Sequence, residues 1–185
     1  MQITIREALP AELAPAGQLT AAVYQDESLA EETYLPRLLD AAARHAAEGA
    51  WQLIAVADAD GGVGTDTDAD TDGADAGGMP GRLVGAAVYT VAGSEYADIA
   101  ADGEAEIRML ATAGDVRGQG IGEALVRHCV RRARKEGRPA LVLSTKPEMR
   151  AAQRLYARLG FTRTPERDWE YAPGKGLLTY RLRLD

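Results

Sequence analysis

The feature that most constrains this chain is a glycine-rich turn that joins an apolar strand to an apolar-striped helix. The run Ile107-Arg108-Met109-Leu110-Ala111-Thr112 has the character of a strand, and a helical pattern begins near Gly120. Gly118, Gly120 and Gly122 let backbone N–H groups approach a ligand closely. The helix that starts there adds the positive end of its dipole. The turn is therefore predicted to bind an anion such as a pyrophosphate.

Two other nucleotide-binding motifs do not fit the same residues. A phosphate-binding P-loop requires Lys and then Ser or Thr after its last glycine, whereas Glu123 and Ala124 follow Gly122. A dinucleotide fingerprint requires a third glycine at position 123, and it also requires an acidic ribose ligand after the next strand. That strand ends in Ser144-Thr145-Lys146. Both motifs are therefore excluded.

The hexapeptide Arg117-Gly118-Gln119-Gly120-Ile121-Gly122 resembles the acetyl-CoA loop of the GNAT superfamily of N-acetyltransferases, whose signature is Arg/Gln-x-x-Gly-x-Gly/Ala. Downstream, Tyr156-Ala157-Arg158-Leu159-Gly160-Phe161 is similar to the second signature of the family, a helix that ends in Tyr-x-x-x-Gly-Phe. Two positions depart from the family pattern: Met149, where an Asn is frequent, and Thr112, where a Val is usual. The resemblance implies an acetyl-CoA-dependent N-acetyltransferase.

The resemblance also implies catalytic roles for two residues. Tyr156 is expected to protonate the departing coenzyme thiolate, since a phenol with a pKa of about 10 is protonated at neutral pH. Glu106, on the strand that leads into the turn, is expected to deprotonate the amine directly or through a water, and Glu104 on the same face is the alternative base. The competing interpretations are a core tyrosine and an exposed glutamate paired with Arg108.

The cofactor site implied by the resemblance has two parts. Backbone N–H groups around Leu110, Ala111 and Thr112 are expected to polarise the thioester carbonyl and to bind pantetheine as a pseudo-strand. The pyrophosphate is expected to lie against the loop residues Arg117, Gly118, Gln119, Gly120, Ile121 and Gly122. A solvated loop position is the alternative for Arg117. No metal is predicted, because His45 and His128 share no ligand spacing.

Periodicity along the chain predicts one domain over residues 1–185 with an α/β (α+β) fold. The resemblance implies the GNAT-like acyl-CoA N-acyltransferase fold, with a mixed, largely antiparallel sheet of about six to seven strands flanked by about four helices. Strands are expected at 2–6, 53–57, 83–91, 104–111, 140–145 and 178–184, and helices at about 13–23, 32–48, 120–137 and 148–159. The Gly- and Asp-rich segment 58–81 is expected to be a mobile acidic loop and not a calcium site.

Composition limits the partners and the compartment. The net charge of -7 disfavours nucleic acid, which clustered Lys and Arg bind, and it favours a cationic or neutral substrate. The single cysteine, Cys129, excludes an intrachain disulfide and falls on an apolar helix stripe, so we expect a small buried hydrophobe there. No apolar run approaches the ~20 residues of a membrane helix, and the first residues lack a secretory pattern. A cytoplasmic protein without membrane partners is therefore expected.

The resemblance implies transfer of the acetyl group of acetyl-CoA to a primary amine of a small-molecule or peptide acceptor, by direct attack on the thioester. Longer acyl donors fit the loop equally, and a homodimer is expected only from the family. Tyr24, Tyr34 and Tyr89 are candidates to line the acceptor pocket, and segment 167–174 either shapes that pocket or forms a turn. The alternatives are a catalytically silent acyl-CoA sensor, which the retained Tyr156 disfavours, and an accessory subunit.

Overall fold

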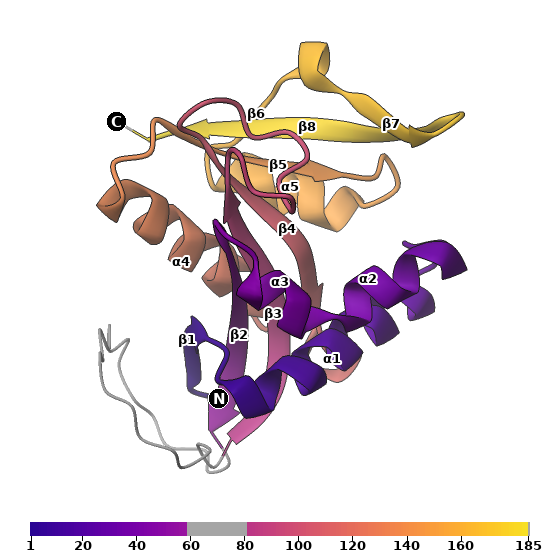
Figure 1. Cartoon of the computed structure of the whole chain (residues 1–185), viewed down its shortest axis with the longest axis vertical. Helices are drawn as coiled ribbons and strands as arrows, with labels where there is room; N and C mark the ends of the chain where they lie inside the picture. The colour runs from indigo at the N-terminus through magenta and orange to yellow at the C-terminus, as the bar shows by residue number, and fades with distance from the viewer. Residues whose placement is uncertain (59–80, 185) are drawn as a thin grey trace.

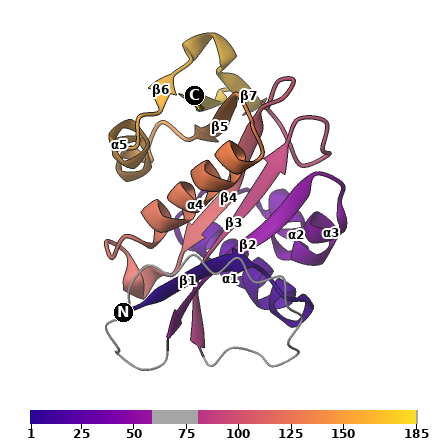
Figure 2. The same ribbon diagram turned by 90° about the vertical axis from the view of Figure 1, so that its left-hand side faces the viewer.

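The computed structural model describes residues 1–58 and 81–184 of the 185-residue chain. Within these residues an eight-stranded sheet separates two groups of helices. Helices α1, α2 and α3 lie on one side of the sheet, whereas α4 and α5 lie on the other (Figures 1 and 2). The predictions made for the acidic segment concern residues 59–80, which lie outside the described residues.

The sheet confirms the predicted mixed and largely antiparallel arrangement. Its strands are β1 (Ile3–Glu7), β2 (Ala50–Asp58), β3 (Gly81–Val91), β4 (Ala105–Thr112), β5 (Ala140–Thr145), β6 (Thr162–Arg163), β7 (Trp169–Ala172) and β8 (Lys175–Arg183). The order is β1-β2-β3-β4-β5-β8-β6, and β7 pairs with β8 outside this order. Strands β4 and β5 run parallel, and the other neighbouring pairs are antiparallel. The short strands β6 and β7 are additions to the sequence prediction, because pairing with β8 and not local pattern holds them.

The helices are α1 (Leu13–Asp26), α2 (Leu35–Leu39), α3 (Ala41–Ala46), α4 (Ile121–Lys135) and α5 (Arg150–Arg158). The prediction of one helix over 32–48 is wrong, because the chain leaves the helical conformation at Asp40, whose ψ is 69°. The Asp40 carboxylate accepts a hydrogen bond of 2.9 Å from the backbone N–H of Ala43 and so caps a new helix. Hydrophobic spacing continues through the break, so periodicity alone did not show it.

A buried arginine closes this break. The guanidinium of Arg44, fully enclosed, donates to the carbonyl oxygens of Arg37 and Leu38 at the end of α2, the second at 2.9 Å. It also donates to Gln52 Oε1 on β2 at 3.1 Å. These bonds satisfy carbonyl groups that a helix end leaves without partners, and they attach α2 to the sheet.

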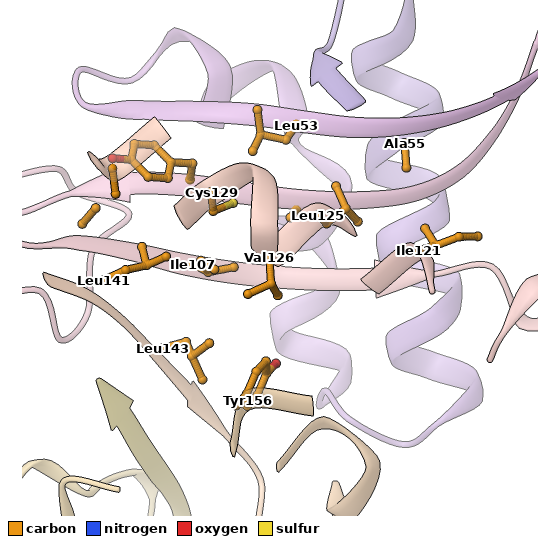
Figure 3. Close-up of a cluster of buried hydrophobic side chains, with 14 of the residues drawn as sticks. Leu53, Ala55, Ile107, Ile121, Leu125, Val126, Cys129, Leu141, Leu143 and Tyr156 are labelled. Atoms are coloured by element: carbon orange, nitrogen blue, oxygen red, sulfur yellow. The ribbon is translucent and has the colours of Figure 1, made fainter. Parts of the chain in front are cut away.

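The largest hydrophobic cluster lies between the sheet and the helices α4 and α5 (Figure 3). It joins Leu53 of β2, Ile107 of β4, Leu125 of α4 and Tyr156 of α5. Cys129 is part of this cluster, and burial raises the pKa of its thiol to about 12, which confirms the predicted buried hydrophobe. No helix within residues 1–58 and 81–184 combines the length and the apolar character that crossing a membrane requires.

Candidate active site

The two parallel strands at the centre of the sheet separate toward their C-terminal ends. They pair only from Ala105↔Leu141 to Ile107↔Leu143, although β4 continues to Thr112 and β5 to Thr145. Met109 has a positive φ of 52°, and the register of β3 against β4 shifts at the same place, which marks a β-bulge. The bulge bends β4 away from β5 and opens a gap between the two strands.

Backbone groups of β4 are exposed to this gap. The N–H of Ala113 donates to Val84 O on β3. Successive N–H groups of a strand point to opposite sides, so those of Thr112 and Leu110 point toward β5. Ala111 instead stands opposite Ala86 on β3. Two of the three backbone positions in the predicted pantetheine site therefore lie where a ligand strand would pair.

A narrow cavity of about 50 Å³ occupies the gap, and Tyr156 lines it together with Leu110, Leu143 and Ser144. The tyrosine ring packs against Phe161 and Tyr180 at centroid distances of 6.0 and 5.9 Å, and its residue is 5% exposed. Burial raises the pKa of this phenol above its ordinary value, so it is protonated at neutral pH.

The glycine-rich turn forms an open cradle at the start of α4. Gly118 and Gly120 have φ values of 78° and 85°, which L side chains rarely adopt. A Cβ at either position would meet no atom of residues 1–58 or 81–184 within 4 Å, so these residues leave the space above the turn open. Gly120 caps α4 without a side-chain hydrogen bond, and the first helical bond runs from Ala124 N to Gly120 O. The N–H groups at the start of α4 are therefore free of intrahelical acceptors.

The charges beside the cradle are balanced. Glu123, in the first turn of α4, accepts from Arg127 at 2.8 Å and from Arg158 at 2.5 Å, which lowers the pKa of its carboxyl group. Arg117 is half-exposed and forms an ion pair with Glu27 at the end of α1. The charged side chains beside the cradle are thus neutralised by ion pairs, and the groups that remain to attract an anion are the backbone N–H dipoles.

Glu106 is enclosed and holds a loop. Its Oε2 atom accepts from the backbone N–H groups of Asp98, Ile99 and Ala100 at 3.0, 2.9 and 3.0 Å. Oε1 finds no hydrogen-bond partner in the described part of the chain and lies 3.7 Å from Arg108 Nε. Burial raises the pKa of this carboxyl group, although Arg108 and the N–H donors oppose the shift. The interpretation of Glu106 as an exposed residue is wrong, while its role as the base stays a prediction.

Glu104, the alternative base, is committed to ion pairs. Its carboxylate contacts Arg167 at 2.9 Å and Arg181 at 2.7 Å, and it accepts from Ala101 N. Burial raises the pKa of the carboxyl group, but the two guanidinium groups outweigh that effect and lower it. Glu104 therefore connects the start of β4 to strand β8 and to the segment after β6. It lines neither the narrow cavity nor the larger one described next.

A second cavity of about 470 Å³ opens beside the gap. It shares six lining residues with the narrow cavity: Tyr24, Ile107, Met109, Ser144, Thr145 and Met149. Its walls come from the α1–α2 region, from β4 with the loop before it, and from β5 with the β7–β8 hairpin. A cavity of this volume accommodates a small molecule.

The structure sorts the predicted acceptor-site residues. Tyr24 and Tyr34 line the larger cavity, and so does β7 within segment 167–174. Tyr89 does not, because it is buried against α4 with its hydroxyl on Glu136 at 2.8 Å. Sequence reasoning missed the charged lining residues Asp98 and Lys146, for which no local motif exists. No group of three potential metal ligands occurs within the described ranges.

Solved structures with the same architecture span the whole chain. An acetyltransferase of the GNAT family from Staphylococcus aureus superposes with a TM-score of 0.68 at 12% identity, covering 100% of both chains. PaiA N-acetyltransferase from Thermoplasma acidophilum, in complex with coenzyme A, gives 0.67 at 13%, covering 99% of each. A GNAT family acetyltransferase from Brucella melitensis, in complex with acetyl-CoA, gives 0.58 at 17%, covering 100% of this chain and 89% of the other.

These similarities define the fold as that of the acyl-CoA N-acyltransferases. The family model described as Acetyltransferase (GNAT) family matches residues 24–161, and the chain belongs to that family. Enzymes of this family use acetyl-CoA as their co-substrate and act on amines. No curated protein sequence matches the chain.

Proposed function

We propose that this chain is a single-domain enzyme that transfers the acetyl group of acetyl-CoA to a primary amine, by direct attack of the amine on the thioester. The observation that carries the proposal is the continuity of the cradle, the gap and the larger cavity. An added Cβ on Gly122 in the cradle would lie 3.6 Å from Thr112 Oγ1 at the end of β4. The larger cavity in turn shares the six lining residues named above with the narrow cavity in the gap.

The cradle is assigned to the pyrophosphate. Its glycines expose backbone N–H groups at the positive end of the α4 dipole, and Arg117 and Gln119 flank them. Pantetheine would extend from there into the gap and pair with the N–H groups of Leu110 and Thr112 as an added strand. The thioester would then lie between Tyr156 and the larger cavity.

The transfer needs one acid and one base. The amine nitrogen attacks the thioester carbon, the C–S bond breaks, and the thiolate takes the phenolic proton of Tyr156. Glu106 takes the proton of the amine through a bridging water, because its side chain lines neither cavity and, among the described residues, no donor bonds to its Oε1. The raised pKa of its carboxyl group makes it a better proton acceptor than an exposed glutamate.

The experiment that tests the cofactor site is calorimetric titration of acetyl-CoA into the wild type and into two glycine variants. Gly120→Glu places a carboxylate in the cradle, where it repels a pyrophosphate. Gly137→Glu is the matched control, because Gly137 also has a positive φ, of 67°, and open space around it, but it follows the other end of α4. Both variants carry the same charge and the same kind of backbone strain.

We expect Gly137→Glu to bind acetyl-CoA like the wild type and Gly120→Glu to lose binding by at least about a hundredfold, or about 2.7 kcal/mol. Absence of binding to the folded wild type would overturn the proposed function. Equal binding to both variants would overturn the assignment of the cradle. With binding established, release of coenzyme thiol during incubation with amines measures turnover and separates an enzyme from a silent acyl-CoA sensor.

A further inference from the structure

The charges that line the larger cavity differ from the charge of the whole chain. The net charge of -7 favours a cationic or neutral substrate, but both carboxylates in the cavity wall are already paired. Asp98 contacts Arg108 at 2.5 Å, and Glu31 forms an ion pair with Lys175 at the β7–β8 hairpin. The cavity therefore offers an incoming ligand little unpaired negative charge.

Lys146 is the cation in this wall that remains available. Its ammonium lies 5.5 Å from the ring centroid of Tyr171. The charge of Lys175, and after it that of Lys146, lowers the pKa of Glu31, but none of the described carboxylates forms an ion pair with Lys146. Arg37 also lines the cavity, but its guanidinium donates to the carbonyl of Glu95 at 3.1 Å and stacks 4.8 Å over Tyr96. An anionic group in the cavity would thus find Lys146 as its free partner.

The backbone of Lys146 is held by hydrogen bonds from α5 and from the residue before that helix, and Lys146 lies beside the gap. It directly follows Thr145, the last residue of β5, which lines both cavities. The side-chain amide of Gln153 on α5 donates to the carbonyls of Lys146 at 3.1 Å and Pro147 at 2.9 Å. The N–H of Met149 donates to the same Lys146 carbonyl at 3.1 Å. The backbone is thereby held next to the place where the acetyl group would be transferred.

Four aromatic side chains line the same cavity as Lys146. Tyr24 and Tyr34 come from the α1–α2 side, and Trp169 and Tyr171 come from β7 on the opposite side. Large aromatic side chains bury apolar groups well and leave their polar atoms at the rim. The cavity therefore suits a ligand with an apolar or aromatic body and an anionic group close to the gap.

We propose that the acceptor is an amino acid with an aromatic or apolar side chain, and that Lys146 binds its carboxylate. The inference rests on the proposed function, because that function places the reacting amine at the gap. In an amino acid a single carbon separates the amine from the carboxylate, so an amine at the gap brings its carboxylate into the adjoining cavity, whose wall includes Lys146, the residue after the gap-lining Thr145. Such a zwitterion has no net charge, so the acidity of the chain does not oppose its approach.

The test measures binding in the cavity without requiring turnover. Trp51 and Trp169 are the two tryptophans of the chain, and Trp51 packs against Tyr89, away from the cavity lining. In a Trp51→Phe protein saturated with coenzyme A, the fluorescence of Trp169 then reports occupancy. The probes are phenylalanine, phenylalanine amide and phenethylamine, which share the ring and the amine and differ at the carboxylate.

We expect phenylalanine to bind at least about tenfold more tightly than the other two probes, as a charge-assisted hydrogen bond provides. Lys146→Gln should reduce that ratio to about one, whereas Arg37→Gln, the matched control at another cation of the cavity lining, should preserve it. Equal binding of acid and amide to the Trp51→Phe protein, or no binding by any probe, would overturn the inference. A ratio preserved in Lys146→Gln would do so as well.

Calorimetry with acetyl-CoA on the same Trp51→Phe protein separates the two proposals. If acetyl-CoA binds and the acid shows no preference, the amino-acid inference alone fails. If acetyl-CoA does not bind, the proposed function fails together with it. Acetylation of a peptide N-terminus in place of the free acid would also count against the inference.

Discussion

Replacing Glu106 by alanine should destabilise the fold by about 3–5 kcal/mol. Three backbone N–H groups, at residues 98, 99 and 100, converge on one oxygen of this enclosed carboxylate. Each donor that is left without a partner costs about 1–3 kcal/mol. For three donors the cost is about 3–9 kcal/mol. The lower half of this range applies, because the Asp98 side chain is 26% exposed and water can reach part of the loop. The substitution also removes a charge whose burial is unfavourable, and this gain offsets a further part of the lost free energy of unfolding.

The glutamine variant separates anchoring from catalysis. Glu106→Gln keeps an oxygen that the three N–H groups can reach, so a loss of only about 1–2 kcal/mol is expected. Its kcat/KM should nevertheless fall by about 10²–10⁴, because an amide cannot act as a base. Urea unfolding measures the first quantity, and thiol release in a folded sample measures the second.

Either measurement can refute the reasoning about Glu106. An alanine variant within about 1 kcal/mol of wild type would show that the loop does not depend on the three hydrogen bonds. A glutamine variant with near wild-type kcat/KM would remove Glu106 as the base and leave it as an anchor of the loop.

Glu106, Tyr156 and Gly17 each allow a further test. Because burial raises the pKa of Glu106, kcat/KM should fall as the pH drops through a value above the ordinary 4.5, and Glu106→Gln should lose this acidic limb of the profile. The same raised pKa means that the stability contributed by this group is full below pH 4.5 and is lost as the pH rises through the folded-state pKa. Tyr156→Phe should lower kcat by roughly 10²-fold with unchanged acetyl-CoA affinity by calorimetry, and an unchanged kcat would remove the tyrosine as the acid. Gly17→Ala should cost about 1–3 kcal/mol in urea unfolding, because an added Cβ would collide with the Leu39 carbonyl oxygen. Gly114→Ala, where a Cβ meets nothing within 4 Å, should change little, and equal losses for both would contradict the steric argument.

The sequence by itself determined the parts of this protein that depend on local backbone preferences. Gly118 and Gly120 take positive φ values that other residues rarely adopt, so the cradle and the start of α4 were predictable to within one residue. The strand over 140–145 was also predicted with its observed bounds, since a short run of apolar residues follows the glycine that ends the preceding helix. The family signatures lie in these same local segments, and therefore the cofactor could be inferred without coordinates.

Packing between distant segments sets which side chains meet at the proposed acceptor site, and no local pattern predicts it. The hydrogen bond from Arg108 to Tyr34 joins residues 74 positions apart, and the ion pair of Glu31 with Lys175 spans 144 positions. Enclosure of Glu106 by a loop and the position of Lys146 beside Tyr171 likewise depend on how the strands and the hairpin pack. Burial and pairing are properties of the folded surroundings, and a local pattern specifies a residue's own conformation but not the groups that will surround it.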